Sequence, residues 1–168
     1  MREKGEAETW NRLIHRHEDL AYSVAYRLLG RAEAATEATE EAAMTAYRAL
    51  PALRGWSFKT WLLREVVAAC RRRSGPGPDG PPAVGRRCLG EERPGPDPAM
   101  VQAIETGIAR LPLEERVVLV LADVHRLSYE EIAQVTGAAP AAVGRRLGSA
   151  RGRLRDWLQV TPAVLSRA

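Results

Sequence analysis

Arginine is gathered at two places in this sequence. One is the triplet Arg71–Arg73, and the other holds five arginines, with no acidic residue among them, between Arg145 and Arg155. The planar guanidinium group donates paired hydrogen bonds to phosphate oxygens or to the edge of a guanine base. The two clusters therefore predict an anionic partner, although the formal net charge of the 168 residues is only +4. Two alternatives remain open: a solvated helix face, and arginines that complement the dipole at a helix end.

Residues that support catalysis or hold a metal are few and scattered. His15 and His17 are two positions apart, which places them on different faces of a helix, and His125 stands alone. Cys70 and Cys88 lack the spacing of a zinc site, and no glycine-rich phosphate loop follows a strand. We therefore expect no catalytic residue, metal, cofactor or small-molecule substrate. The pattern favours a binding protein over an enzyme that acts on nucleic acid.

The composition predicts an all-α protein. Alanine, leucine, arginine and glutamate dominate, whereas aromatic residues make up only 5% of the chain. Residues 74–98 hold seven of the eleven prolines and are expected to form a flexible linker between two small helical domains, 1–73 and 99–168. No run approaches the roughly 18 apolar residues of a membrane span. We therefore expect a cytoplasmic protein that does not insert into membranes.

Apolar residues at helical spacing divide the first domain into three helices. The first is expected to end at Gly30, the second to run over Glu33–Leu50 before Pro51, and the third to start near Ser57 and end in the arginine triplet.

The second domain is predicted to begin with a helix over 98–110 and to continue with a buried helix that starts at Pro112 and ends near Val124. Ser128 and Glu131 have the spacing of a capping box, which opens a short helix that stops at Gly137.

A short capped helix, a glycine-containing turn and a longer basic helix form the pattern of a helix-turn-helix, whose second helix enters the major groove of DNA. The last helix is predicted over Pro140–Leu158. Its apolar residues recur every three or four positions from Val143 and must face the core, which turns Arg145, Arg146 and Arg153 outward. The sequence leaves open whether these arginines contact bases or only phosphates, and a helix-turn-helix that binds no DNA is the alternative.

Motifs in both halves point to one family. Those of the second domain are Leu111-Pro112 with Glu114-Glu115-Arg116, then Ser128-Tyr129-Glu130-Glu131-Ile132-Ala133, then Val143 with Arg146-Leu147 and Ala150-Arg151. Those of the first domain are Tyr26–Gly30, Ala46–Leu50, Arg54-Gly55 and Phe58–Leu62. In this order they resemble the extracytoplasmic-function sigma factors of the sigma-70 family.

The resemblance implies a transcription initiation factor. The C-terminal domain of such a factor binds the minus-thirty-five promoter element and the flap of the polymerase β subunit. The N-terminal domain binds the β′ clamp helices and opens the minus-ten element. The expected partners are therefore core RNA polymerase, promoter DNA and an anti-sigma factor.

The resemblance also assigns individual residues. The expected minus-thirty-five contacts are Pro140, Arg145, Arg146, Ser149, Arg151 and Arg153. The expected minus-ten contacts are Arg54, Trp56, Ser57, Lys59, Arg64, Arg71 and Arg72. The expected contacts to core polymerase are Glu37, Glu40, Glu41, Tyr47 and Arg48.

Several positions depart from the family pattern. Ala35–Thr39 replace much of a denser acidic signature, and Ala142 and Gly144 stand where the family has a hydroxyl and a basic side chain. Gly144, Gly148 and Gly152 lie four apart on one helix face, which indicates either close approach of a partner or drift. The departures motivate the alternative, a degenerate sigma-like regulator that binds DNA or protein without supporting initiation.

Overall fold

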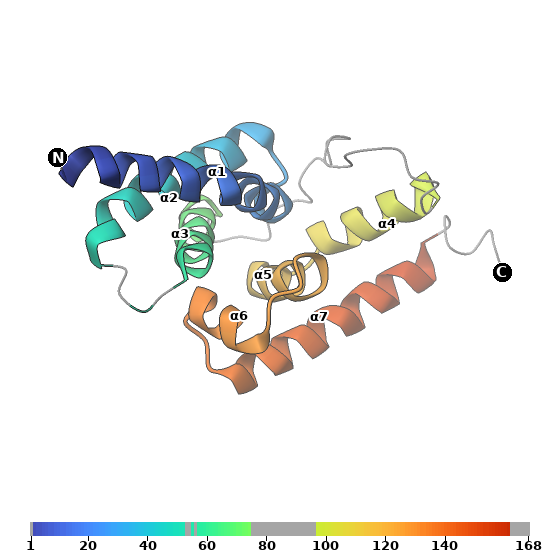
Figure 1. The fold of residues 1–168 in the computed structure, drawn as a ribbon. Coiled ribbons are helices and arrows are strands. Elements are labelled where there is room, and N and C mark those ends of the chain that lie inside the picture. The colour runs from blue at the N-terminus through green and yellow to red at the C-terminus, as the bar shows by residue number, and fades with distance from the viewer. Residues whose placement is uncertain (1, 53–54, 56, 75–96, 162–168) are drawn as a thin grey trace.

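The computed structural model describes residues 2–52, 55, 57–74 and 97–161, and these residues form helices and turns without a strand (Figure 1). The all-α prediction is confirmed. The predicted linker lies outside the described residues except at its ends, where Ser74 follows one helix and Asp97 caps the next. None of the described helices combines the length and the apolar stretch that a membrane crossing requires.

Three helices form the N-terminal half, α1–α3. They are α1 (Arg2–Leu29), α2 (Ala32–Ala49) and α3 (Phe58–Arg73), with a short 3₁₀ turn, η1 (Leu50–Ala52), after α2. Gly30 adopts a left-handed φ of 69° between α1 and α2, as the predicted stop requires. The residues that α2 buries are all alanines, which lets α1 and α3 approach its backbone closely.

The C-terminal half, α4–α7, is built around its last helix. Its elements are α4 (Pro98–Ala109), α5 (Leu113–Leu119), a π-helical turn η2 (Val120–Val124), α6 (Tyr129–Thr136) and α7 (Pro140–Val160). Helices α4, α5 and α6 all pack against α7. On α4, Gly107 leaves room for the ring of Trp157, whose Nε1 donates to the carbonyl oxygen of Ala103 at 3.0 Å.

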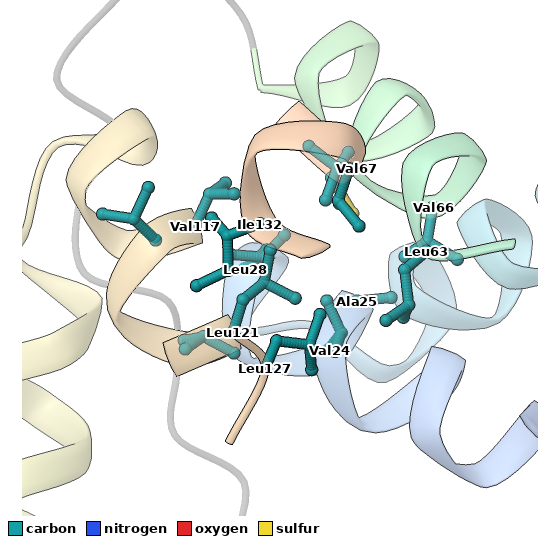
Figure 2. Close-up of a cluster of buried hydrophobic side chains, with 14 of the residues drawn as sticks. Val24, Ala25, Leu28, Leu63, Val66, Val67, Val117, Leu121, Leu127 and Ile132 are labelled. Carbon is teal, nitrogen blue, oxygen red and sulfur yellow. The ribbon is translucent and has the colours of Figure 1, made fainter. Parts of the chain in front are cut away.

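The two halves share one apolar core. Leu28 of α1, Val67 of α3, Leu121 of η2 and Ile132 of α6 belong to a single buried cluster (Figure 2). Helix α3 packs on α6, while α1 contacts α4, α5 and η2. Each half therefore covers apolar surface that the other would expose to water, which is favourable by about 25 cal/mol for each Å² removed.

A buried arginine crosses the boundary between the halves. Arg116 of α5 is 6% exposed. Its Nη1 donates to the carbonyl oxygen of Leu28 at 2.5 Å, and its Nη2 donates to those of Ala109 and Leu111 at 2.6 and 2.9 Å. One cation thus binds carbonyl groups at the C-terminal ends of α1 and α4, where helices leave such groups without partners of their own.

Two glycine-to-alanine substitutions should change stability in opposite directions. At Gly148 an added methyl group meets no atom within 4 Å, so the better helix propensity of alanine should raise the free energy of unfolding by about 0.5–1 kcal/mol. At Gly107 it would come within 2.5 Å of Trp157 and 2.6 Å of Leu154, so Gly107→Ala should lower that free energy by about 1–3 kcal/mol. Urea unfolding of both variants measures the two changes, and equal shifts would contradict the packing of α4 on α7.

Candidate nucleic-acid interface

Helices α6 and α7 form the predicted helix-turn-helix. The Ser128 hydroxyl accepts a hydrogen bond from the Glu131 amide at 3.1 Å, and the Glu131 carboxylate accepts one from the Ser128 amide at 2.9 Å. This is the predicted capping box. Gly137 ends α6 with a left-handed φ of 72°, and α7 begins two residues after the turn with Pro140 in its first position.

One side of α7 faces the core and the other faces solvent. Val143, Leu147 and Ala150 are buried, as their spacing predicts. Arg145 and Arg155 are exposed on the opposite side, ten residues apart, which separates them by about 15 Å along the helix axis. The side of α7 that faces away from the core is therefore basic and open to a ligand.

Three of the predicted minus-thirty-five residues lie instead along the flank of α7 that faces α5. Arg146 Nη1 is 3.2 Å from a carboxylate oxygen of Glu114. The Ser149 hydroxyl donates to Glu115 at 2.8 Å, and Arg153 Nε lies 3.1 Å from the same carboxylate group. Each of these polar groups already has an acidic partner within the C-terminal half.

Arg151 lies on the other flank of α7. It makes a bidentate pair with Asp123 of η2, with distances of 2.6 and 3.0 Å, and this hydrogen-bonded pair raises the pKa of the guanidinium group. The six predicted minus-thirty-five residues are thus spread over three sides of α7. Of these, Pro140 and Arg145 are exposed and make no ion pair in the part of the chain that the structure describes.

The three glycines of α7 do not bring another helix close. A methyl group added at Gly144 would lie 3.8 Å from the Tyr129 ring, one at Gly148 would meet nothing within 4 Å, and one at Gly152 would approach only the end of Arg155. Close approach within this chain therefore does not explain them, and approach of a partner stays a prediction.

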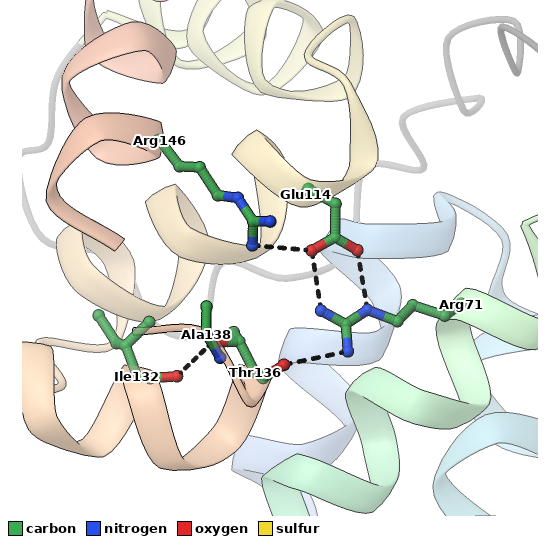
Figure 3. Close-up of polar contacts among 6 residues, drawn as sticks. All are labelled: Arg71, Glu114, Ile132, Thr136, Ala138 and Arg146. Atoms are coloured by element: carbon green, nitrogen blue, oxygen red, sulfur yellow. Dashed lines mark hydrogen bonds and ion pairs between the residues drawn. The ribbon is translucent and has the colours of Figure 1, made fainter. Parts of the chain in front are cut away.

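Three of the predicted minus-ten residues on α3 form ion pairs with acidic side chains. Lys59 Nζ lies 2.7 Å from Glu131. Arg71 pairs with both oxygens of Glu114 (Figure 3), and Arg72 pairs with Glu41 at 2.5 Å. The remaining candidates are placed as follows: Ser57 stands at the N-cap position of α3 without a side-chain capping hydrogen bond and Arg64 is exposed, while Arg54 and Trp56 lie outside the described residues.

The predicted polymerase contacts all lie on helix α2, but they do not all face solvent. Glu37, Glu40, Tyr47 and Arg48 are exposed, and the carboxylate of Glu37 also lies 3.7 Å from Nε of Arg73 on α3. Glu41 faces α3 instead, where its carboxylate contacts both Arg72 and Arg73 at 2.5 Å. Hydrogen bonds from Arg73 and then Arg72 lower the pKa of Glu41, so this acid holds α2 against α3 as an ion.

Sequence reasoning missed an apolar side chain on the outer side of α2. Met44 is 58% exposed, and Tyr47 beside it is 49% exposed with its ring in an edge contact to Trp10, 5.2 Å between centroids. Positions 37, 40, 44, 47 and 48 repeat at helical spacing, so they form one stripe. The signal was present in the sequence, because a methionine at this spacing faces away from the alanines that α2 buries.

The described residues hold no group of three metal-binding side chains. Burial raises the pKa of the Cys70 thiol to about 12, which leaves it protonated and unreactive. His125 is partly buried rather than a surface residue, and burial lowers its pKa to about 4. The described surface offers charged and apolar binding groups.

Two family models match the chain, one to each half. A model described as sigma-70 region 2 matches residues 13–74, and one described as sigma-70 region 4 matches residues 101–154. Together they match more than half of the chain. The first match covers α2 and α3, and the second covers α5, α6 and most of α7.

Known relatives resemble the chain over most of its length. The ECF RNA polymerase sigma factor SigE of Mycolicibacterium smegmatis is 30% identical over 159 residues, which is 89% of this chain and 62% of that protein. The chain therefore spans less than two thirds of that relative. The ECF RNA polymerase sigma factor SigM of Mycobacterium tuberculosis is 29% identical over 162 residues, with 92% of this chain and 79% of that protein covered.

A solved structure has the same fold. The sigma factor RpoE of Bartonella quintana, in complex with the anti-sigma factor NepR, matches with a TM-score of 0.70 at 18% identity, over 91% of this chain and 98% of that one. The match therefore includes both halves. With regions 2 and 4 in the family order, the chain belongs to the extracytoplasmic-function group of the sigma-70 family.

Proposed function

We propose that this chain is an alternative sigma factor that binds core RNA polymerase, directs it to promoters and supports initiation without catalysing a reaction itself. The two matched regions and the names of the relatives support this proposal. Its place of action is then the cytoplasm, where core polymerase and promoter DNA are found.

The main structural support for the proposal is the outer stripe of α2, formed by positions 37, 40, 44, 47 and 48. Exposed carboxylates at Glu37 and Glu40 flank Met44 and Tyr47, which expose large apolar surface that nothing in the described chain covers. Apolar side chains ringed by charges are typical of a protein interface. This stripe is our proposed contact with the β′ clamp helices, with Arg48 at its edge.

The outer side of α7 is the proposed contact with the minus-thirty-five element. Residues near the start of a recognition helix contact base edges in most helix-turn-helix complexes, and Arg145 is the exposed arginine at that end. Lys59, Arg64, Arg71 and Arg72 of α3 are the proposed contacts to the minus-ten element, together with Arg54, Trp56 and Ser57 before it.

An anti-sigma factor is a further proposed partner. The solved relative RpoE was determined with the anti-sigma factor NepR, and CnrH, a second structure with a TM-score of 0.67, was determined with the cytosolic domain of CnrY. We propose that this chain takes a partner of the same kind.

A sigma-like regulator that does not support initiation is the second candidate. The observation that favours it is the pairing of Arg146, Arg151 and Arg153 with acids of the chain itself. Run-off transcription with bacterial core polymerase on a random promoter library separates the two candidates. Transcripts that depend on the chain exclude the second, and core binding without transcripts excludes the first.

Charge reversal on the stripe should weaken polymerase binding. The variant Glu40→Lys places a cation where the proposed interface needs an acid, so affinity for core polymerase should fall at least about tenfold. Glu37 and Glu41 are left unchanged because both pair with Arg73 of α3, and their loss would disturb the packing of α2 on α3. Fluorescence anisotropy with labelled chain measures the affinity.

Glu130→Lys is the control for this experiment, because it reverses a charge at an exposed position of α6 far along the chain. It should leave core binding within about twofold. Equal losses in both variants, or none in either, would refute the proposed surface on α2.

Arg145 should contribute more to promoter recognition than Arg155. Arg145→Ala should weaken binding of the holoenzyme to a duplex selected from a random pool by about tenfold, because a base or phosphate contact of arginine is worth about 1–3 kcal/mol. Arg155→Ala removes the same charge about 15 Å further along α7 and should cost less than about threefold. Equal effects of the two variants in a filter-binding titration would mean that the first turns of α7 do not enter the major groove.

A further inference from the structure

Three aromatic side chains from three helices meet at one end of the N-terminal half. The ring of Trp10 on α1 makes an edge contact with Tyr47 of α2, with 5.2 Å between centroids and 72° between planes. It makes a second edge contact with Phe58, the first residue of α3, at 5.7 Å and 84°. Edge-to-face ring pairs attract each other at these separations. Trp10 thus connects the other two rings, and we call the three rings the aromatic corner.

Two rings of the aromatic corner are held by the fold, and the third faces solvent. Trp10 and Phe58 pack against the buried core, whereas Tyr47 is one of the exposed large apolar side chains. The ring of His17 lies 5.9 Å from that of Phe58. Trp10 and His17 are seven residues apart, which is about two helical turns, so α1 contacts Phe58 at two points on one face. Trp10 therefore has a fixed neighbour on the side away from Tyr47.

Helix α2 itself gives the Tyr47 ring little support. The residues that α2 buries are all alanines, whose side chains are too short to hold a tyrosine ring in one orientation. An exposed side chain without such support exchanges between rotamers, and a partner that binds it must first order it. The indole of Trp10 comes from another helix and supplies the contact that α2 lacks. Part of the ordering is then complete before a partner binds.

We propose that Trp10 is a positioning residue of the polymerase contact: it holds the Tyr47 ring in the orientation that Tyr47 keeps when the outer stripe of α2 binds core polymerase. The inference rests on the proposed function and adds to that surface a residue of α1. Rigid tyrosines are typical of the side chains that dominate protein interfaces, and pre-ordering of such a ring raises affinity without a new contact. Trp10 acts through Tyr47 and need not touch the polymerase.

Substitution of Trp10 tests this role. Trp10→Leu keeps an apolar side chain at the core and removes the ring, so affinity for core polymerase should fall about three- to tenfold. Trp10→Phe retains an aromatic edge for Tyr47 and should restore most of that loss. Fluorescence anisotropy with labelled full-length chain and bacterial core polymerase measures both affinities, and circular dichroism checks that the helices are retained.

A double-mutant cycle separates positioning from a purely structural role. Tyr47→Ala should lower core affinity on the order of tenfold. In that background Trp10→Leu should change affinity by less than about twofold, because no ring remains to be positioned. If Trp10 only stabilised the N-terminal half, Trp10→Leu would lower affinity by the same factor with Tyr47 and with Ala at position 47, and the inference would be overturned.

The matched control for stability is Val66→Ala. Val66 is fully buried in the same half, eight residues after Phe58 and thus about 12 Å further along α3. Urea unfolding should show a loss of stability for Val66→Ala as for Trp10→Leu, but core affinity should stay within about twofold of the wild type. An equal loss of core affinity in the two variants would mean that stability alone explains the effect of Trp10.

The contact can also be measured without polymerase. The chain has four tyrosines, so ¹³C labelling of tyrosine rings gives few NMR signals, and the Tyr47 signal is the one that Tyr47→Phe removes. In Trp10→Leu this signal should move toward the position of free tyrosine; an unchanged signal would overturn the inference. Failure of the wild-type chain to bind core polymerase is failure of the proposed function. Core binding that Tyr47→Ala leaves at the wild-type value is failure of the positioning role alone.

Discussion

The guanidinium group of Arg116 is the contact on which the arrangement of the two halves depends. It lies where α1 and α4 end, and it donates to carbonyl groups of both. Helix C-termini carry partial negative charge and carbonyl groups without intrahelical partners, so two such ends meeting at one point would repel each other and leave buried acceptors unsatisfied. A single buried cation resolves both problems. Loss of Arg116 would therefore affect the joint between the halves before it affected any helix alone.

The shared core follows from this joint. Each half is small, and a small helical domain buries too little apolar surface to be very stable alone. Packing Leu28 and Val67 against Leu121 and Ile132 removes that surface from water. It also places the last turns of α3 beside α5 and α6, so basic side chains reach acids that belong to the other half. The charge pattern at the boundary is thus a consequence of apolar packing.

Local structure was predictable from the sequence because local rules determine it. Gly30, Gly137 and the Ser128 capping box are where the turn and cap rules put them, and the buried positions of α7 follow its apolar spacing. A salt bridge between residues far apart in the chain leaves no such pattern. Nothing in the sequence around Glu41 indicates that it faces Arg73 rather than solvent.

The candidate site was less predictable for the same reason. Spacing alone predicts that Arg146 and Arg153 point away from the core. In the structure both lie on the flank of α7 that faces α5, where Glu114 and Glu115 pair with them. On the exposed stripe of α2, the acidic residues were predicted from the sequence, whereas Met44 was missed. The residues before α3 that resemble a minus-ten loop lie partly outside the described chain, so their assignment stays a prediction.

An arginine paired with an acid of its own chain is still available to DNA. A half-exposed ion pair contributes about 0–1 kcal/mol, because solvent screens it and two long side chains must be ordered to make it. A phosphate contact on duplex DNA is driven in addition by release of condensed counterions, a gain that no internal carboxylate provides. If Arg71 and Arg146 contact DNA as proposed, exchange of the carboxylate for a phosphate is therefore favourable at both.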